Sequence, residues 1–171
     1  MSEQREIIDN PPQIRTASLK DLSSILNVEK SAFPPSRQAS PDTLQKRLQL
    51  FPQGCLVAEQ DEKIIGFETS LLTLDVRSIT ELDQLDEMIH NPSGTVYYLR
   101  SLATKQEFQR QGIGKALTEE AIKVARKFKK KIFRLTASQD VEQFYIKLGF
   151  QRITEYQDFH GLPQAIWELK L

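Results

Sequence analysis

The sequence predicts a single mixed α/β domain in which helices flank a central sheet that is mostly antiparallel. Strand-type and helix-type patterns follow the order β-α-α-β-β-(α)-β-α-β-α-β-β, which is typical of a layered fold. A hairpin-like pair of apolar runs precedes a strand–loop–helix unit at 96–128, and two further strand-like runs close the chain. The 171 residues suit one domain with its own core, so we expect a flexible arm over 1–12 and one domain over 13–171.

The first two helices are marked by capping residues and by prolines. After a short strand over 13–17, Ser18 is predicted to be an N-cap, with Asp21 three residues later. We expect that helix to stop near Phe33, because two consecutive prolines follow. A second helix is predicted to start at Ser40, where proline occupies the first helical position.

The middle of the chain combines a hairpin with an irregular acidic segment. The runs 54–59 and 64–71 flank a short polar turn, which predicts a β-hairpin. Residues 72–95 are less regular, and we expect a helix from Ile79 to Ile89 within them. This segment either borders a substrate site or forms a solvated surface connection.

The second half has the clearest helix. A strand is expected over 96–103, and apolar residues three and four apart mark one face of a helix from Ile113 to Phe128. Further strand-type runs are predicted over 131–136, 152–156 and 165–169.

Composition and charge argue against several classes of function. The formal net charge is zero, so no global electrostatic attraction to nucleic acid or membrane is expected. The single cysteine, Cys55, excludes an intramolecular disulfide, and two separated histidines add no metal-ligand cluster, so we expect no metal. Neither a signal-peptide pattern nor an apolar run of membrane-spanning length is present, so we expect a cytoplasmic protein. We interpret the basic run at 126–131 as a solvated helix end rather than a nucleic-acid surface, because helix C-termini favour cations.

The most informative pattern is the loop from Gln109 to Lys115, which contains Gly112 and Gly114. The first turn of a helix has free N–H groups and a partial positive charge, which together suit a phosphate. Glycines there let a bulky anion approach the backbone. A Walker A loop would need a glycine where Gln109 stands, and a dinucleotide fingerprint would need one where Leu117 stands. The loop is therefore predicted to cradle a phosphate of another kind.

Read as Gln-x-x-Gly-x-Gly, this loop resembles the acyl-CoA pyrophosphate loop of the GNAT superfamily of N-acetyltransferases. A second block, Phe144 to Phe150, is similar to that family's Phe/Leu-Tyr-x-x-x-Gly-Phe signature and follows a strand-like run. The two motifs stand in the family's order, and the resemblance spans nearly the whole chain from residue 13. The front half is most similar to the arylalkylamine N-acetyltransferase-like branch, notably at 32–34, 51–54 and 66–67.

The resemblance implies a GNAT-like sheet splayed around acetyl-CoA, which is the expected cofactor. Its pantetheine arm would pair with the backbone of Leu102, Ala103 and Thr104. Its pyrophosphate would meet the backbone amides of Gln109, Arg110, Gln111, Gly112, Ile113, Gly114 and Lys115. Ser138 stands where many relatives carry an asparagine that contacts the cofactor, and it has a hydroxyl with shorter reach.

Two tyrosines are the expected catalytic residues. By resemblance, Tyr145 would lie by the thioester sulfur and give a proton or a hydrogen bond to the leaving thiolate. A phenol pKa of ~10 exceeds a thiol pKa of ~8.5, so full proton transfer is mildly uphill. Tyr98 occupies the central strand where several branches place a base or a water-binding group. The histidines of the arylalkylamine enzymes are replaced by Tyr98 and Arg100, so the base is not identified by the motif.

The sequence thus predicts an acyl-CoA-dependent N-acetyltransferase that acetylates a primary amine by direct attack in a ternary complex. The alternatives left open are N-terminal acetylation of a protein or peptide and a catalytically silent acyl-CoA sensor. The expected partners are a small-molecule amine or peptide acceptor, with no nucleic acid and no membrane, and the chain is expected to be a monomer or a homodimer. The acceptor is expected to contact Phe33, Glu29, Glu68, Tyr98 and Arg100, with the two glutamates as candidate bases or amine-binding carboxylates.

Overall fold

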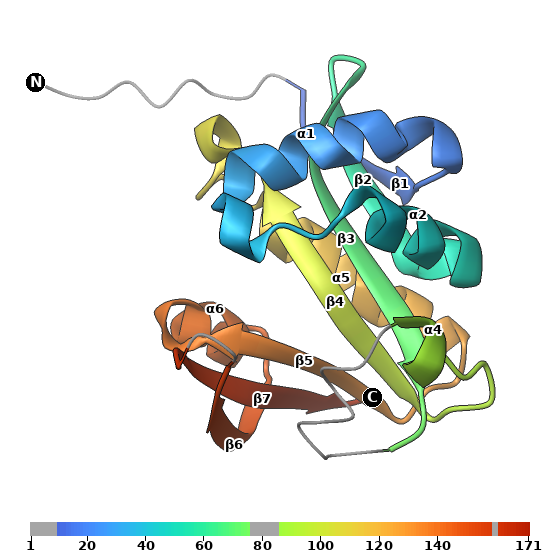
Figure 1. Cartoon of the computed structure of the whole chain (residues 1–171), viewed down its shortest axis with the longest axis vertical. Helices are drawn as coiled ribbons and strands as arrows, with labels where there is room; N and C mark the ends of the chain where they lie inside the picture. The colour runs from blue at the N-terminus through green and yellow to red at the C-terminus, as the bar shows by residue number, and fades with distance from the viewer. Residues whose placement is uncertain (1–9, 76–85, 159–160) are drawn as a thin grey trace, which may run out of the picture.

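A computed structural model describes residues 10–75, 86–158 and 161–171 of the chain and shows one seven-stranded sheet (Figure 1). The strand order is β1-β2-β3-β4-β5-β7-β6, and only the pair β4–β5 is parallel. The strands are β1 Gln13–Thr16, β2 Cys55–Gln60, β3 Lys63–Thr73, β4 Val96–Thr104, β5 Ile132–Ser138, β6 Gln151–Gln157 and β7 Pro163–Lys170. The predicted class, a mostly antiparallel sheet flanked by helices, is confirmed.

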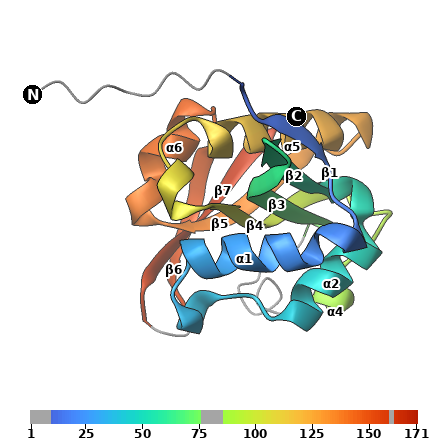
Figure 2. The same cartoon turned by 90° about the horizontal axis from the view of Figure 1, so that it is seen from above.

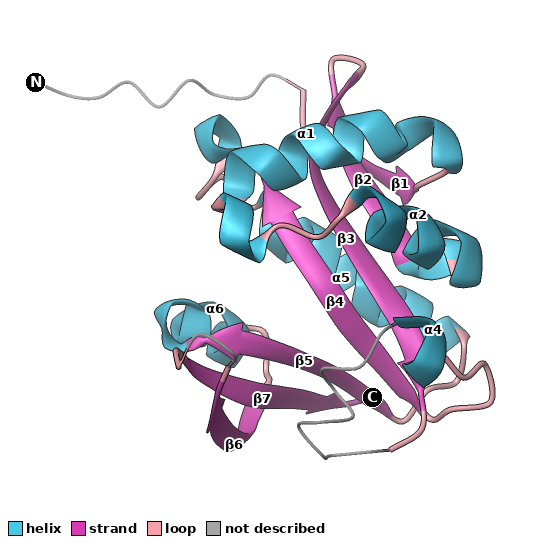
Figure 3. Cartoon of the chain, in the orientation of Figure 1, coloured by secondary structure: helices cyan, strands magenta, loops and turns pink. Residues whose placement is uncertain are grey.

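Helices cover both faces of this sheet. Figure 2 shows α1 and α2 on one face and α5 on the other, and Figure 3 shows α6 beside the end of β5. The described helices are α1 Leu22–Ala32, α2 Pro41–Leu50, α4 Asp86–Ile89, α5 Ile113–Lys127 and α6 Glu142–Lys147. Of the helix predicted from Ile79 to Ile89, only α4 falls within the described residues, and the rest of that prediction lies outside them.

The local signals for the first helices act as predicted, with one refinement. Ser40 caps α2 by accepting a hydrogen bond from the Thr43 N–H at 3.1 Å. After Ser18 the chain first makes a short 3₁₀ turn, and α1 begins only at Leu22. The Asp21 carboxylate accepts from the Ser18 N–H at 2.8 Å, so this pair still organises the helix start.

The two largest apolar clusters among the described residues lie on opposite faces of the sheet. The larger core packs the inner face of α5, including Leu117 and Ala121, against Tyr97 and neighbouring strand residues. The second core packs α1 and α2 against the other face, and it includes Cys55. The Cys55 side chain is fully buried, with its Sγ 3.5 Å from the Phe51 carbonyl oxygen. The central strands are therefore held from both sides.

The parallel pair β4–β5 is short, and this shortness shapes the molecule. Residues Val96 to Leu99 pair with Ile132 to Leu135, and the pairing ends there. Beyond that point β4 stays paired with β3 and β5 stays paired with β7. The two strands therefore diverge, as Figure 1 shows, and each keeps a sheet partner on its outer side only.

A β-bulge in β4 coincides with the divergence. Thr69 of β3 faces Ser101, whereas the next residue, Ser70, faces Leu99. Arg100 is therefore the extra residue, with no directly opposite partner in β3. A bulge bends its strand and redirects its side chains, so β4 turns away from β5 where their pairing stops.

A buried carboxyl group lies in the middle of β3. Glu68 is fully buried; its Oε1 accepts from the Tyr97 hydroxyl at 3.1 Å and its Oε2 from the Ser70 hydroxyl at 2.7 Å. Burial without a cationic partner raises the pKa of Glu68 to about 8. At neutral pH the folded protein therefore keeps this carboxyl mostly protonated.

Replacement of Glu68 by glutamine should flatten the pH dependence of stability. The folded-state pKa of about 8 lies above the ordinary value of 4.5. The contribution of Glu68 to stability is therefore complete below the ordinary pKa and is lost as pH rises through the folded-state value. Across that window the wild type should lose up to about 1.4 kcal/mol of unfolding free energy per pH unit from this group.

Urea unfolding of wild type and Glu68→Gln at several pH values between about 5 and 8 measures this difference. Glu119→Gln, at an exposed position on α5, is the matched control and should keep the wild-type pH slope. Equal slopes for wild type and Glu68→Gln would contradict the raised pKa.

Candidate functional site

A cavity of about 1200 Å³ occupies the region where β4 and β5 separate. Its walls come from the end of α1 and the chain leading to α2, the second half of β4, the glycine loop, the end of β5, and α6. The predicted cofactor residues that line it are Leu102, Ala103, Thr104, Gln109, Arg110, Gly112, Ile113, Gly114, Lys115, Ser138 and Tyr145. Gln111 is not among its lining residues. Segments far apart in sequence thus meet around one space.

At the start of α5, the glycine loop leaves backbone amides that have no backbone acceptor among the described residues. The first amide bonded within the helix is that of Ala116, which donates to the Gly112 carbonyl at 3.0 Å. The amides of Ile113, Gly114 and Lys115 precede it and have no intrahelical acceptor. These amides lie at the positive end of the helix dipole, so the cavity wall here suits an anion.

Glycine at position 112 suits both the backbone conformation and the open space beside it. Its φ of +83° lies in the left-handed region, which favours glycine. A Cβ atom there would meet nothing within 4 Å, so the volume next to the amides is open. At Gly114, by contrast, a Cβ would touch the Phe144 ring at 3.7 Å, an ordinary contact. Gly112 therefore provides a left-handed backbone with open space beside it, whereas the space beside Gly114 is bordered by the Phe144 ring.

Two glutamines hold this loop in place through their side chains. Gln109 Nε2 donates to the Thr104 carbonyl at 3.2 Å, which ties the loop to the end of β4. Gln111 Nε2 donates to the Glu107 carbonyl at 3.3 Å. The side chain of Gln111 therefore stabilises the loop itself.

Tyr145 enters the cavity from α6, and the glycine that follows fixes its position. Gly149 has a φ of +90°, and the Phe150 N–H donates back to the Tyr145 carbonyl at 3.0 Å, which ends the helix as a Schellman turn. The Phe150 ring then packs on Tyr145 with centroids 5.6 Å apart. Burial raises the pKa of the Tyr145 phenol well above its ordinary value. The phenol therefore stays neutral and can donate a hydrogen bond.

Glu29, on α1, lines the same cavity. Its side chain is 2% exposed, and its Oε1 accepts from the Ala39 N–H at 2.7 Å. Its Oε2 is buried and has no hydrogen-bond partner among the described residues. Burial raises the pKa of Glu29, against the opposing effects of the Ala39 hydrogen bond and of the nearby Arg47 charge.

Arg47 is a wall residue that the sequence analysis missed. It is 5% exposed, and its Nη1 donates to Ser101 Oγ at 2.8 Å and to Thr69 Oγ1 at 3.3 Å. It therefore joins α2 to both strands beside the bulge. Its signal in the sequence is a cation between Leu44 and Leu48 on the apolar face of the predicted helix.

The remaining predicted acceptor residues divide into two groups. Phe33 and Arg100 line the cavity together with Glu29. Tyr98 and Glu68 are not among the described residues that line it. Tyr98 is buried beside Val96 and Ile166, and its hydroxyl is 3.1 Å from Arg100 Nη1.

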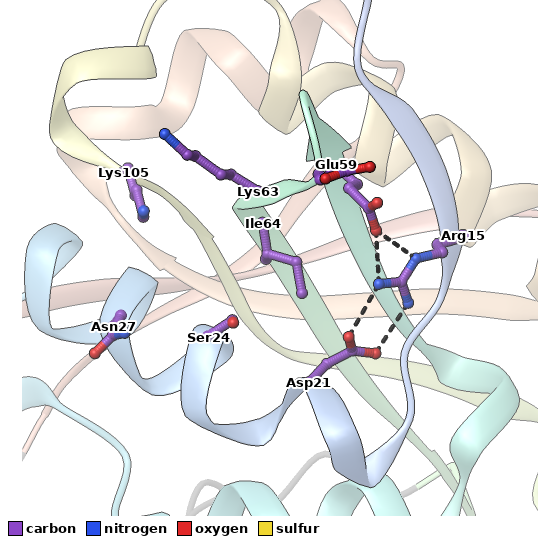
Figure 4. A pocket seen from close by; sticks show the side chains of 9 residues that line it. Arg15, Asp21, Ser24, Asn27, Glu59, Lys63, Ile64 and Lys105 are labelled. Carbon is purple, nitrogen blue, oxygen red and sulfur yellow. Dashed lines mark hydrogen bonds and ion pairs between the residues drawn. The ribbon is translucent and has the colours of Figure 1, made fainter.

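A second, smaller cavity of about 320 Å³ lies at the far end of the sheet (Figure 4). The Arg15 guanidinium there binds Asp21 through two hydrogen bonds of 2.9 Å and Glu59 through one of 2.7 Å. The bond from Arg15 lowers the pKa of Asp21. Because these charges satisfy one another, this cluster ties β1 to β2 and to the start of α1.

Two further properties concern the described residues only. Within 10–75, 86–158 and 161–171, no group of histidine, cysteine and carboxylate side chains is arranged to hold a metal ion. In the same part of the chain, no helix combines the length and apolarity needed to cross a membrane.

Comparison with known proteins gives a family match. The profile described as "Acetyltransferase (GNAT) family" matches residues 22–150. Two Bacillus subtilis (strain 168) proteins are similar in sequence. The probable hydrolase YhcX is 31% identical over 120 residues, covering 67% of this chain and 23% of that protein. The uncharacterized N-acetyltransferase YkwB is 26% identical over 114 residues, covering 61% and 50% respectively. This chain therefore aligns with at most half the length of either relative.

Solved structures share the fold. The GphF GNAT-like decarboxylase in complex with isobutyryl-CoA superposes with a TM-score of 0.78 at 18% identity, covering 92% of this chain and 98% of that one. The PaiA N-acetyltransferase from Thermoplasma acidophilum, in complex with coenzyme A, gives a TM-score of 0.68 at 21% identity, with 94% and 99% covered. At these identities the likeness shows the fold.

A carboxylate at position 112 should weaken acyl-CoA binding through charge. Asn and Asp tolerate left-handed backbone similarly and have the same shape, so Gly112→Asn is the matched control for Gly112→Asp. We expect calorimetric affinity for acetyl-CoA to be roughly tenfold lower for the aspartate variant than for the asparagine variant. The difference should shrink at high salt, because salt screens exposed charges. Equal affinities would place the pyrophosphate elsewhere.

Proposed function

Because the chain belongs to the acetyltransferase (GNAT) family, we propose that it is an acetyl-CoA-dependent N-acetyltransferase acting on a primary amine. The observation that carries this proposal is the shared cavity: unpaired amides of the glycine loop, the diverging strands and Tyr145 all line one space. The chemistry would be direct attack of the amine on the thioester within a ternary complex.

The described residues fit acetyl-CoA as a substrate along the length of the cavity. The amides at the start of α5 and the open volume beside Gly112 suit the pyrophosphate. The edge of β4 from Leu102 to Thr104 has lost β5 as a neighbour, so its backbone groups, apart from the Thr104 carbonyl that Gln109 already contacts, are available to the amides of the pantetheine arm. Ser138 lines the opposite wall, at the end of β5. The thioester would then lie between the Arg100 bulge and Tyr145.

Tyr145 would stabilise the leaving thiolate by hydrogen bonding. Its raised pKa makes it a weaker acid than an ordinary phenol, so full transfer of its proton to sulfur is less favourable. A neutral, positioned hydroxyl can still donate to the thiolate as the carbon–sulfur bond breaks. The role is therefore electrostatic stabilisation rather than complete protonation.

The acceptor is a small-molecule amine or a peptide terminus, and the chain acts as a monomer or homodimer without nucleic acid or membrane.

In the basic run at 126–131, one lysine has a structural role. Lys130 Nζ donates to the carbonyl oxygens of Gly94 at 2.7 Å and Pro92 at 3.1 Å. This lysine fastens the end of α5 to the turn before β4.

The test of this function is thiol release from acetyl-CoA. The assay uses a panel of simple amines, polyamines, aminoglycosides, arylalkylamines and short peptides, with acetyl-CoA affinity measured by calorimetry. Turnover with one class, and mass-spectrometric detection of the N-acetylated product, would establish the activity and the acceptor. Turnover confined to peptides would favour N-terminal acetylation. Tight cofactor binding with no turnover would favour a silent acyl-CoA sensor.

Replacement of Tyr145 by phenylalanine should lower turnover and leave cofactor binding unchanged. Loss of the hydroxyl removes the donor to the thiolate, for which a decrease of roughly 100-fold in kcat is expected. The ring still packs on Phe150, so melting temperature and acetyl-CoA affinity should match the wild type. Unchanged kcat would remove Tyr145 from the mechanism.

A further inference from the structure

We propose that Glu29 is the residue that binds the ammonium group of the acceptor and takes its proton. This inference rests on the proposed acetyltransferase function and identifies the base that the sequence motif does not supply. It also assigns the acceptor end of the cavity to the wall formed by α1 and α2.

The two oxygens of the Glu29 carboxylate have different surroundings. One oxygen, Oε1, is held by the Ala39 N–H at 2.7 Å, which fixes the side chain in one orientation. The other, Oε2, is buried in a residue that is 2% exposed, and no described group satisfies it. An unsatisfied buried carboxylate oxygen is costly, so a native protein rarely keeps one without a use. An ammonium group bound in the cavity would satisfy it.

A second observation is the position of Glu29 relative to the reaction centre. Glu29 lines the same cavity as Tyr145 and the bulge residue Arg100. Arg47, whose charge acts on Glu29, donates to Ser101 Oγ, in the residue next to the bulge. The carboxylate therefore lies on the wall beside the bulge, and Tyr145 approaches the cavity from α6. The charged residues that share this wall are Arg37, between α1 and α2, Arg47 of α2 and Arg100 of β4.

The other carboxylates are less suited to this task. Glu68 is enclosed in the core, with both oxygens hydrogen-bonded, and does not line the cavity. Asp158 lines the cavity but accepts from the Leu162 N–H at 3.0 Å and from Gln164 Nε2 at 3.2 Å. It also lies 3.9 Å from Arg37. Asp140 also lines the cavity but is exposed to solvent. Among the carboxylates that line the cavity in the described residues, Glu29 has the buried oxygen without a partner.

The ammonium group of the acceptor gives one proton to Glu29 Oε2, leaving a neutral amine and a protonated carboxyl. The nitrogen lone pair forms a bond to the thioester carbonyl carbon, and the carbon–sulfur bond breaks with its electron pair on sulfur. One of the two protons still on nitrogen passes to the thiolate and the other stays, giving the amide N–H and free coenzyme A. Glu29 then releases its proton to solvent, so one proton is set free per turnover.

Glu29→Gln is the variant that separates this role from a structural one. The amide oxygen of glutamine can still accept from the Ala39 N–H, so the chain between α1 and α2 keeps its anchor. Glutamine cannot take a proton. We expect kcat/KM for the amine to fall roughly 100-fold, with acetyl-CoA affinity and melting temperature unchanged.

Glu29→Asp is the second variant, and the order of the two activities is the diagnostic result. Aspartate keeps the carboxylate but its shorter side chain reaches Ala39 poorly. If Glu29 handles the proton, the aspartate variant is more active than the glutamine variant. If Glu29 only anchors the loop, the order reverses, and that reversal would overturn the proposal.

The pH dependence gives an independent readout. An amine with a pKa of ~10 is mostly protonated near neutrality and needs a base, whereas near pH ~10 solution supplies the neutral amine. The deficit of Glu29→Gln relative to wild type should therefore narrow as the pH rises. A deficit that stays constant with pH would contradict proton removal by Glu29.

Failure of this inference and failure of the proposed function have different signatures. If wild type turns over an amine and Glu29→Gln does so equally well, Glu29 is not the base and the acetyltransferase function stands. If wild type binds acetyl-CoA but acetylates nothing in the panel, the proposed function fails, and with it the role assigned to Glu29.

Discussion

The separation of β4 from β5 is the constraint on which the rest of the site depends. Backbone groups at the edge of a strand need partners, and the parallel pairing that supplies them stops at Leu99. Beyond it the outer edges remain paired with β3 and β7, so the two halves of the sheet are firmly built while the space between them stays open. The glycine loop, the bulge and α6 are all placed by the strands that border this gap.

Buried polar groups gather along the walls of the gap. Arg47 bridges the bulge through two hydroxyl groups. Glu29 has one carboxylate oxygen hydrogen-bonded and one without a partner in the part of the chain that the structure describes. Glu68, in contrast, has both oxygens hydrogen-bonded in the core. A buried charged group that lacks a hydrogen-bond partner is costly in a folded protein. Such a group is therefore expected where a bound ligand supplies the missing partner. The distribution of unsatisfied atoms separates the two glutamates, although the sequence presents them as equals.

Features set by local chemistry were predictable from the sequence, and features set by strand pairing were not. The cap at Ser40, the stop before the two prolines and the left-handed glycines at 112 and 149 each follow from one residue's own conformational preference. The bulge at Arg100 depends on the register between β3 and β4, which no local pattern encodes. That register, together with the packing of α2, decides which side chains reach the cavity. The sequence patterns therefore missed Arg47 and placed Tyr98 and Glu68 among the acceptor residues, although neither lines the cavity.

The burial of Cys55 bears on how this protein can be handled. Thiol reagents react with thiolates that they can reach, and the folded chain encloses its one sulfhydryl at the start of β2, close to the Phe51 carbonyl. A colorimetric reagent mixed with intact protein should therefore give little signal of its own. Once a molecule unfolds, it contributes one reactive equivalent. Titration of a stock before any substrate is added thus counts its denatured fraction, a built-in measure of sample quality.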